Sequence, residues 1–221
     1  DHYRMATSRS TSRPSGRAAT RVSGERSRER ILDAAERLLA ERGYAAAGIA
    51  AISEASGLPA SSIYWFFESK QDLTAAVVER SADRWITELT ASAEAEASVP
   101  LSGLMKRALA QSGGKLPGFL RLATLLSLEL EDPAILERLR RLRGRGHALI
   151  ETALENALSG TGVREARRLA RTLAPLAAAF VEGALVAEEV DPGRIDVERL
   201  AEDIEVALRA VAAHRLEGGR R

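Results

Sequence analysis

The side chains that could carry out catalytic chemistry are few. The chain has no cysteine, which excludes a thiol nucleophile, a cysteine zinc finger and a disulfide scaffold. Apart from His2, the histidines are His147 and His214, and neither belongs to a His-Glu-x-x-His or Glu-x-x-His metal motif. The segment Gly113-Gly114-Lys115 lacks the first glycine and the Ser or Thr of a phosphate-binding loop. We therefore expect no enzyme, no cofactor and no metal site.

Basic residues gather in two places. The first thirty residues hold eight arginines against three acidic residues, although the formal net charge of the whole chain is only +1. Residues 1–25 are polar and basic, so we expect a disordered leader there, either a solvated tail or an arm along a phosphate backbone. Residues 1–4, before Met5, are interpreted as vector-derived. Five arginines between 138 and 145 alternate with leucines, which indicates a solvated helix face rather than a second nucleic-acid site.

Amphipathic helices are the elements that must position any functional group. Apolar residues make up 45% of the chain and aromatic residues only 4%, so the core must consist mainly of Leu, Ala, Ile and Val, which suit helices. Apolar residues recur at helical intervals, and no segment shows sustained strand alternation. We predict an all-α fold with about nine helices. The segment 117–130 is apolar nearly all round, so we expect it to be buried.

Three helices near the N-terminus have the order of a helix-turn-helix domain. The first runs from near Ser27 to Gly43, a short second helix ends at Gly57, and the third spans residues 59–66. Pro59 suits the first position of a helix, where its missing N–H would be unpaired anyway. Two short helices joined by a glycine-containing turn, behind a longer helix, form the plan in which the third is the recognition helix. Small side chains at its start would let the backbone approach base edges: Ala60, Ser61 and Ser62.

The same region resembles the TetR family of bacterial regulators. The resemblance covers residues 28–78 and rests on RILDAAERLL at 30–39, IAAISEASGL at 49–58 and IYWFFESKQDL at 63–73. It implies a DNA-binding domain at residues 26–72, and a helical regulatory and dimerisation domain at residues 73–221. The chain departs from the family pattern at Gly48, Pro59 and Ser61, where the family usually has Thr, Ser or Thr, and Gly. We therefore expect the recognition helix to bind DNA in the same orientation as in the family, whereas the operator sequence cannot be inferred from that of a relative.

The resemblance assigns the DNA contacts residue by residue. The hydroxyl of Tyr64 would bind a phosphate, although a partly buried packing tyrosine is the alternative. Lys70 would reach a phosphate from the first turn of its helix or remain solvated, and Trp65 would press on the sugar-phosphate backbone or cover the hydrophobic seam. Ser61 and Ser62 would touch base edges or phosphates. The complete expected set is Gly48, Pro59, Ala60, Ser61, Ser62, Tyr64, Trp65 and Lys70.

A ligand cavity is also implied by the resemblance, in the middle of the second domain. Polar residues set into apolar helices are the best candidates for its lining. The expected lining is Phe119, Arg121, Leu122, Leu126, Glu129, His147 and Ile150. Arg121 or Glu129 would bind a polar group of the ligand, or the two would pair with each other, or each would stay solvated. A cavity lined mainly by apolar residues favours a lipophilic ligand.

A dimer is expected because one helix-turn-helix binds DNA weakly, whereas two related by a two-fold axis read two half-sites. The resemblance implies that the last two long helices form the interface. The expected residues are Ala177, Phe180, Val181, Ala184, Leu200, Ile204 and Leu208. The alternative is that these apolar stripes complete the core of the monomer.

Together these expectations describe a cytoplasmic, TetR-like transcription repressor. It would bind a palindromic operator in double-stranded DNA as a homodimer and be released by a small-molecule effector through a shift in the populations of two conformations. The alternatives are a helical DNA-binding regulator without a small ligand and a helical interaction module that does not bind DNA. The operator, the regulated genes and the effector are not encoded in any pattern of the sequence.

Overall fold

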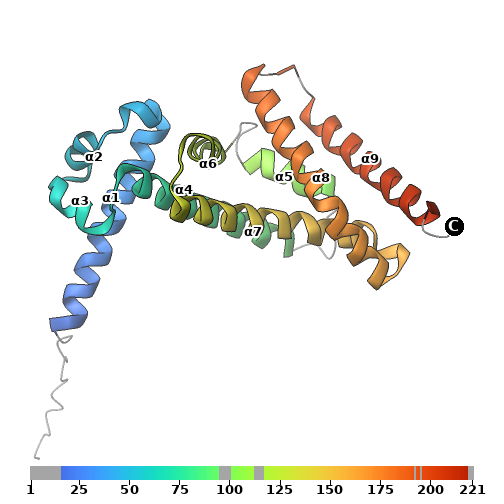
Figure 1. Ribbon diagram of the computed structural model, residues 1–221, viewed down its shortest axis with the longest axis horizontal. Coiled ribbons are helices and arrows are strands. Elements are labelled where there is room, and N and C mark those ends of the chain that lie inside the picture. Colours follow the sequence, from blue (N-terminus) through green and yellow to red (C-terminus); the bar gives the residue numbers. More distant parts are fainter. Residues whose placement is uncertain (1–15, 95–100, 112–116, 192, 195, 219–221) are drawn as a thin grey trace, which may run out of the picture. The chain divides into compact units, whose positions relative to one another are not determined.

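The computed structural model describes residues 16–94, 101–111, 117–191, 193–194 and 196–218. Over these residues the chain forms nine α-helices, one short 3-10 helix (Ser159–Thr161) and no strand (Figure 1). The all-α fold and the expected number of helices are confirmed. The chain divides into two compact units, Asp1–Lys70 and Gln71–Arg221. None of the described helices is apolar over a length that could cross a bilayer.

The first unit consists of α1 (Gly16–Ala46), α2 (Ile49–Ser56) and α3 (Ala60–Phe66). One face of α1 packs against Ile52 of α2 and Ile63 of α3, both of which are fully buried. The buried residues of that face recur at helical spacing: Ile31, Leu32, Ala34, Ala35, Leu38 and Leu39. At Gly43 the backbone leaves the helical conformation (φ 74°, ψ 174°), which glycine adopts without steric cost.

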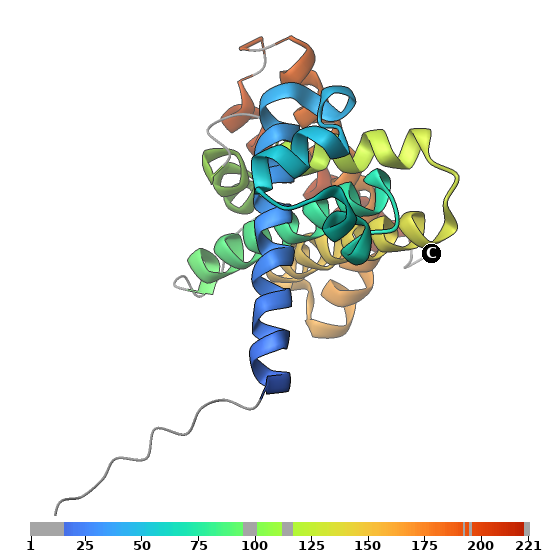
Figure 2. The same ribbon diagram turned by 90° about the vertical axis from the view of Figure 1, so that its left-hand side faces the viewer.

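The beginning of α1 corrects the predicted leader. The helix begins at Gly16 rather than near Ser27, so the prediction of a disordered segment is wrong for residues 16–25. Its first turns extend past α2 and α3 (Figures 1 and 2). Alanine and arginine are strong helix formers, and adding residues to an existing helix needs no new nucleation. Residues 1–15 of the predicted leader lie outside the described residues.

The second unit is built from six helices: α4 (Lys70–Glu94, which begins at the last residue of the first unit), α5 (Leu101–Gln111), α6 (Gly118–Glu129), α7 (Pro133–Ala157), α8 (Val163–Val190) and α9 (Val197–Gly218). α7 lies along α8, and α5 packs on α9 (Figure 1). Asp132 caps α7, since its Oδ1 accepts hydrogen bonds from the amides of Ala134 at 2.8 Å and Ile135 at 3.3 Å. The main core contains Leu101, Met105, Leu154, Leu169, Leu173, Ala177, Ile204 and Leu208.

α6 is not the buried helix that its composition predicts. Leu126 is its one buried residue among those described, and Leu128 is 81% exposed. The reason is that the apolar residues of α6 face a cavity on one side instead of packed side chains on all sides. An all-round apolar pattern cannot distinguish these two environments.

A carboxylate from α9 completes the start of α5. Glu205 Oε2 accepts hydrogen bonds from the Ser102 amide at 2.9 Å and the Ser102 hydroxyl at 2.5 Å, while Arg209 donates to Oε1 at 2.8 Å. Burial raises the pKa of Glu205, but these hydrogen bonds outweigh it and hold the pKa below its usual value. A lowered carboxyl pKa means that the charged form stabilises the fold above the unfolded pKa and stops doing so as the pH falls through the folded pKa.

We therefore expect Glu205→Gln to lower the free energy of unfolding by about 1–2 kcal/mol at neutral pH, and by less as the pH falls to about 4. Urea unfolding at several pH values and one protein concentration measures both quantities. The matched control is Glu202→Gln on the same helix, where the carboxylate makes an exposed ion pair with Lys106 at 2.6 Å, which contributes about 0–1 kcal/mol. A loss at Glu205 that does not change with pH would contradict the role of the charged carboxylate.

Candidate nucleic-acid interface and ligand cavity

The turn between α2 and α3 is fixed by local hydrogen bonds. Gly57 ends α2 in the left-handed conformation (φ 64°, ψ 27°), which is costly for residues with a side chain. Ser53 Oγ donates a hydrogen bond to the Leu58 carbonyl at 2.7 Å, and the Leu58 amide donates to the Ser53 carbonyl at 3.3 Å. Arg30 of α1 donates to the Ser56 carbonyl at 2.7 Å. These contacts set the direction in which α3 leaves α2.

α3 has one buried face and one exposed face. Ile63 and, just beyond the helix, Phe67 are buried, whereas Tyr64 is 57% exposed and Trp65 is 77% exposed. Trp65 packs edge-on against Phe66, with ring centroids 4.5 Å apart. Neighbouring aromatic side chains that remain exposed indicate a surface that a partner covers.

The other predicted contacts of α2 and α3 lie at the starts of these helices. Pro59 is the N-cap of α3 rather than its first residue, because its backbone is extended (φ −62°, ψ 152°) and the helix begins at Ala60. Ala60 and Ser62 are half-buried, and Ser61 is exposed. Gly48 is the N-cap of α2, with an extended backbone (φ −77°, ψ 160°). Their contacts with DNA stay predictions.

Lys70, the first residue of α4, is bound to the end of α1. Its Nζ donates hydrogen bonds to the carbonyls of Tyr44 at 2.5 Å and Ala45 at 3.4 Å, and it lies 4.3 Å from the centre of the Tyr44 ring. Burial lowers the pKa of Lys70 below its usual value. No sequence pattern links residues 44 and 70, so this contact was not predicted. It places the ammonium group beside the segment that leads to Gly48, the other end of the predicted interface.

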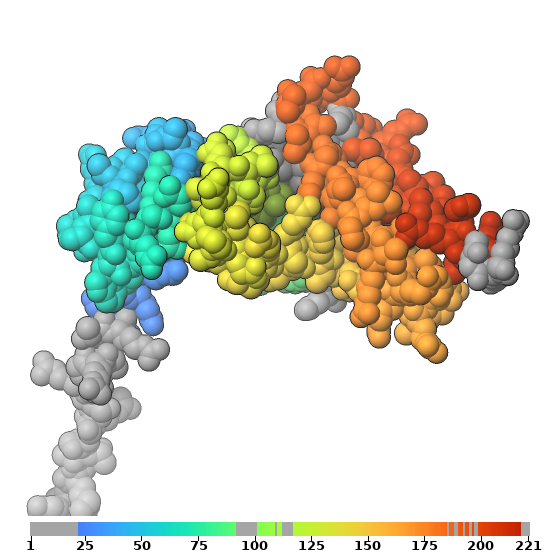
Figure 3. Space-filling view, viewed as in Figure 1, coloured from blue at the N-terminus to red at the C-terminus, as the bar shows by residue number. Residues whose placement is uncertain are grey.

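The second unit contains a cavity of about 1080 Å³, just above the usual range of about 300–1,000 Å³ for small-molecule sites. Residues of α4, α5, α6, α7 and α8 line it, and most of them are apolar. Trp85 of α4 and Phe119 of α6 meet in its wall, with ring centroids 5.7 Å apart. The surface is hollowed between α6 (yellow-green) and α8 (orange) in the space-filling view (Figure 3).

Of the seven residues predicted to line the cavity, Phe119, His147 and Ile150 do so. The others do not, because they lie on different faces of α6: Arg121 and Glu129 are exposed, Leu122 is half-buried and Leu126 is packed in the interior. The face of α6 that lines the cavity consists of Phe119, Leu120, Ala123, Thr124, Ser127 and Leu128. The spacing of Leu120, Thr124 and Leu128, four residues apart, is the signal that would have found this face.

The predicted dimer residues divide into three groups. Ala177, Ile204 and Leu208 are buried within the single chain, and the half-buried Leu200 packs against the same core. This packing agrees with the alternative that the apolar stripes complete the monomer core, and the dimer interface stays a prediction. Val181 and Ala184 line the cavity. Phe180 remains on the surface and is 42% exposed, together with the exposed apolar residues Leu176 of α8 and Val206 of α9.

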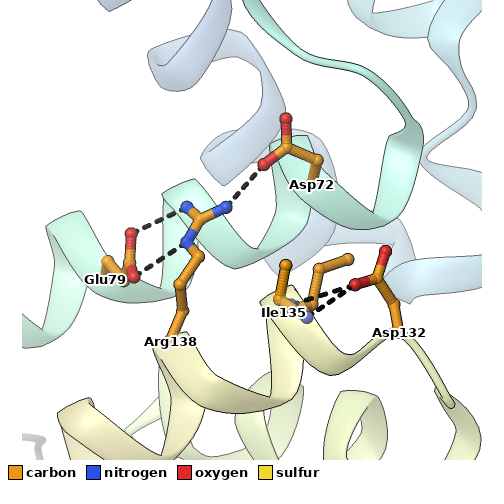
Figure 4. A network of polar contacts seen from close by, with 6 residues as sticks. Asp72, Glu79, Asp132, Ile135 and Arg138 are labelled. Atoms are coloured by element: carbon orange, nitrogen blue, oxygen red, sulfur yellow. Dashed lines mark hydrogen bonds and ion pairs between the residues drawn. The ribbon is translucent and has the colours of Figure 1, made fainter.

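Arg138 of α7 holds two carboxylates of α4 (Figure 4). Its Nε and Nη2 donate to the two oxygens of Glu79 at 2.9 and 2.7 Å, and its Nη1 donates to Asp72 at 2.5 Å. The hydrogen bond with Glu79 raises the pKa of Arg138, burial lowers it by less, and the hydrogen bond with Asp72 raises it further. Since the Arg138 side chain is only 22% exposed, the prediction that this basic run is a solvated face is wrong at its first member. We call Arg138, Asp72 and Glu79 the Arg138 network.

Comparison with known proteins agrees with this geometry. Residues 31–77 match the sequence profile "Bacterial regulatory proteins, tetR family". The chain is 33% identical over 92 residues to the HTH-type transcriptional regulator TtgR of Pseudomonas putida, which covers 42% of this chain and 43% of TtgR. It is 34% identical over 62 residues to AcrR of Shigella flexneri, which covers 28% of this chain and 29% of AcrR. The chain thus spans less than half the length of these curated relatives.

Similar solved structures extend over most of the chain and show the fold. A putative transcriptional regulator from Pseudomonas aeruginosa PAO1 has a TM-score of 0.66 at 17% identity, and the match covers 88% of this chain and 94% of that one. FadR from Bacillus subtilis, solved in complex with stearoyl-CoA, has a TM-score of 0.62 at 16% identity, with coverage of 81% and 96%. Residues 31–77 thus carry the helix-turn-helix sequence of the tetR family of bacterial regulatory proteins, and the described chain has the all-helical fold of the solved transcriptional regulators.

Proposed function

We propose that this protein is a cytoplasmic transcription repressor that binds a palindromic operator as a homodimer and releases it when a small lipophilic ligand binds. The observation that carries the proposal is the exposed pair Tyr64 and Trp65 on α3, in a domain that matches the tetR family. Relatives matched over this region are named HTH-type transcriptional regulators. A large, mainly apolar cavity in the second unit supports the ligand-responsive part.

In the proposed complex α3 lies in the major groove. The Tyr64 hydroxyl donates a hydrogen bond to a phosphate, and Trp65 covers the adjoining sugar-phosphate backbone. Ala60, Ser61 and Ser62 approach base edges, with little sequence information from such short side chains. Lys70 and the backbone around Gly48 and Pro59 bind the flanking backbone, where contacts fix the position on DNA without reading sequence.

The proposed ligand occupies the cavity in one of two conformations of the dimer. A ligand that binds better to the form with wrongly spaced recognition helices lowers the operator affinity by the same factor. The lining of leucine, alanine and aromatic side chains favours an apolar ligand. FadR of B. subtilis, which has the same fold, was solved with stearoyl-CoA, and the apolar acyl chain of that molecule supports a ligand with a long apolar part.

The variant Tyr64→Phe tests the proposed interface, because it removes the hydroxyl and keeps the ring. Operators are selected from a randomised duplex pool, and their affinities are measured at a fixed salt concentration. We expect a palindromic consensus and an affinity about 100-fold lower for Tyr64→Phe, since each of the two protomers loses one hydrogen bond to a charged group, which contributes about 1.5 kcal/mol. Lys70→Ala is less specific, because it also removes the contact with Tyr44.

The control is Val163→Ala, an exposed residue of the second unit, which should bind the operator as the unchanged protein does. If no duplex is enriched even at low salt, the DNA-binding function is rejected and a helical interaction module takes its place. If the operator is bound but no lipophilic compound releases it, the protein is a regulator without a small ligand.

A further inference from the structure

The few charged groups of the cavity come from α7 and α8. The described lining contains three charged residues: Arg140 and Arg143 of α7 and Glu182 of α8. Arg143 Nη2 binds Glu182 Oε2 at 2.8 Å, so these two charges neutralise each other. Arg140 binds Glu137 at 3.4 Å, but Glu137 also binds Arg141 at 3.5 Å. The lining therefore keeps a net positive charge at Arg140, which attracts an anion.

A histidine follows these arginines along α7. Arg140, Arg143 and His147 are spaced three and four residues apart, so they share one face of the helix. At a rise of about 1.5 Å per residue, His147 lies about 10 Å further along α7 than Arg140. His147 lines the same cavity as the aromatic pair Trp85 and Phe119.

The imidazole of His147 has an unused hydrogen-bonding atom. Its Nε2 is buried and has no hydrogen-bond partner among the residues that the structure describes. Buried polar atoms are almost always paired, and a lone unpaired nitrogen in the wall of an apolar cavity indicates that the occupant supplies the partner. An acyl oxygen is such a partner, because it accepts a hydrogen bond from the N–H of imidazole.

We propose, on the basis of the proposed ligand-binding function, that the effector is an anionic amphiphile with a long apolar chain and an acyl oxygen. The chain lies against Trp85 and Phe119, the acyl oxygen accepts a hydrogen bond from His147 Nε2, and the negative head faces Arg140. A free fatty acid and an acyl thioester both have this chemistry. Thr124 and Ser127 line the same cavity, and their hydroxyl groups could form hydrogen bonds with the head of a larger ligand.

The fluorescence of Trp85 reports directly on whether a ligand occupies the cavity. The chain has two tryptophans, and a Trp65→Phe background leaves Trp85 as the one fluorophore of this kind, in the wall of the cavity. Oleate, oleoyl-coenzyme A and oleyl alcohol are titrated into this protein. We expect both anions to change the fluorescence, and the neutral alcohol to bind at least tenfold more weakly. Comparison of the two anions distinguishes the free acid from the thioester.

Variants of α7 separate the two proposed contacts. His147→Phe should weaken the better anion about tenfold, and His147→Gln, which keeps an N–H donor, should retain most of the affinity. Arg140→Gln should weaken the anions and leave the alcohol unchanged. The control is Arg145→Gln on the same helix, which removes an exposed arginine that pairs with Asp83 and lies outside the cavity lining, and it should have no effect. Thermal unfolding of each variant checks that it is folded.

Two results would overturn the proposal. One is equal affinity for the acid and the alcohol together with normal binding by His147→Phe, which would mean that the cavity selects for apolarity alone. The other is no fluorescence change with any of the three probes. In both cases operator binding by the unchanged protein, which retains Trp65, decides separately whether the proposed DNA-binding function stands.

Discussion

Replacing Arg138 by alanine is expected to lower the free energy of unfolding by about 2–3 kcal/mol. Arg138 satisfies both oxygens of Glu79 and one oxygen of Asp72, and the three side chains are 22%, 31% and 25% exposed. Removing one partner of a buried ion pair leaves the remaining charges desolvated and unpaired, which costs about 3–5 kcal/mol for full burial. Since these groups keep some contact with water, we expect a loss of about 2–3 kcal/mol instead of the value for full burial. Urea unfolding at one protein concentration measures the change.

The comparison variants make the cause identifiable. Arg141→Ala removes an exposed arginine three residues away, whose partner Glu137 lies at 3.5 Å, and should change stability by about 0.5 kcal/mol or less. Combining Arg138→Ala with Asp72→Asn and Glu79→Gln should recover part of the loss, because the stranded negative charges are then gone. No recovery in the triple variant would mean that Arg138 stabilises the protein by packing alone.

The Arg138 network also bears on the proposed regulation. α4 begins at Lys70, a proposed phosphate contact, and α7 lines the ligand cavity. Arg138 joins these two helices. DNA binding and ligand binding influence each other when both favour one of two conformations of the same structural element. Helix α4, joined to α7 by Arg138, is the candidate for that element here.

The helix-turn-helix was predictable because its signals are local. Gly57 ends one helix, Pro59 precedes the next, and Ile52 and Ile63 mark the buried faces, all within a dozen residues. The start of α1 was missed because a polar, basic composition is shared by disordered segments and by the exposed turns of a helix. Only the continuation of α1 from its packed part distinguishes the two.

The cavity and the Arg138 network were not predictable because their partners are far apart in sequence. Asp72 and Glu79 lie 66 and 59 residues before Arg138, and no periodicity relates them. For α6 the apolar pattern does not indicate which face meets packed side chains and which meets the cavity. The same limit applies to α8, where Ala177 and Phe180 differ in burial although both belong to the predicted stripe.

The largest functional effect is expected from Phe180→Arg, which should convert a proposed dimer into a monomer and weaken operator binding by at least about 100-fold. Phe180, Leu176 and Val206 leave large apolar side chains on the surface of α8 and α9, and a two-fold interface would bring each of them against its symmetry-related surface. Each dimer would then contain two new charges with no designed partner, at a site that must lose water. Without the dimer, the two half-sites are bound independently, and the gain from linkage, about 10²–10⁴, is lost.

Sedimentation and operator titration, measured on the same samples, decide this prediction. Val163→Arg is the matched control, since Val163 is more exposed than Phe180 and lies at the first residue of α8. It should leave both mass and affinity unchanged. If Phe180→Arg lowers operator affinity while the protein remains a dimer, the residue acts on the spacing of the two recognition helices rather than on association. A dimer with unchanged affinity would instead place the interface on another surface, because an interface that tolerates two buried arginines is not the one described here.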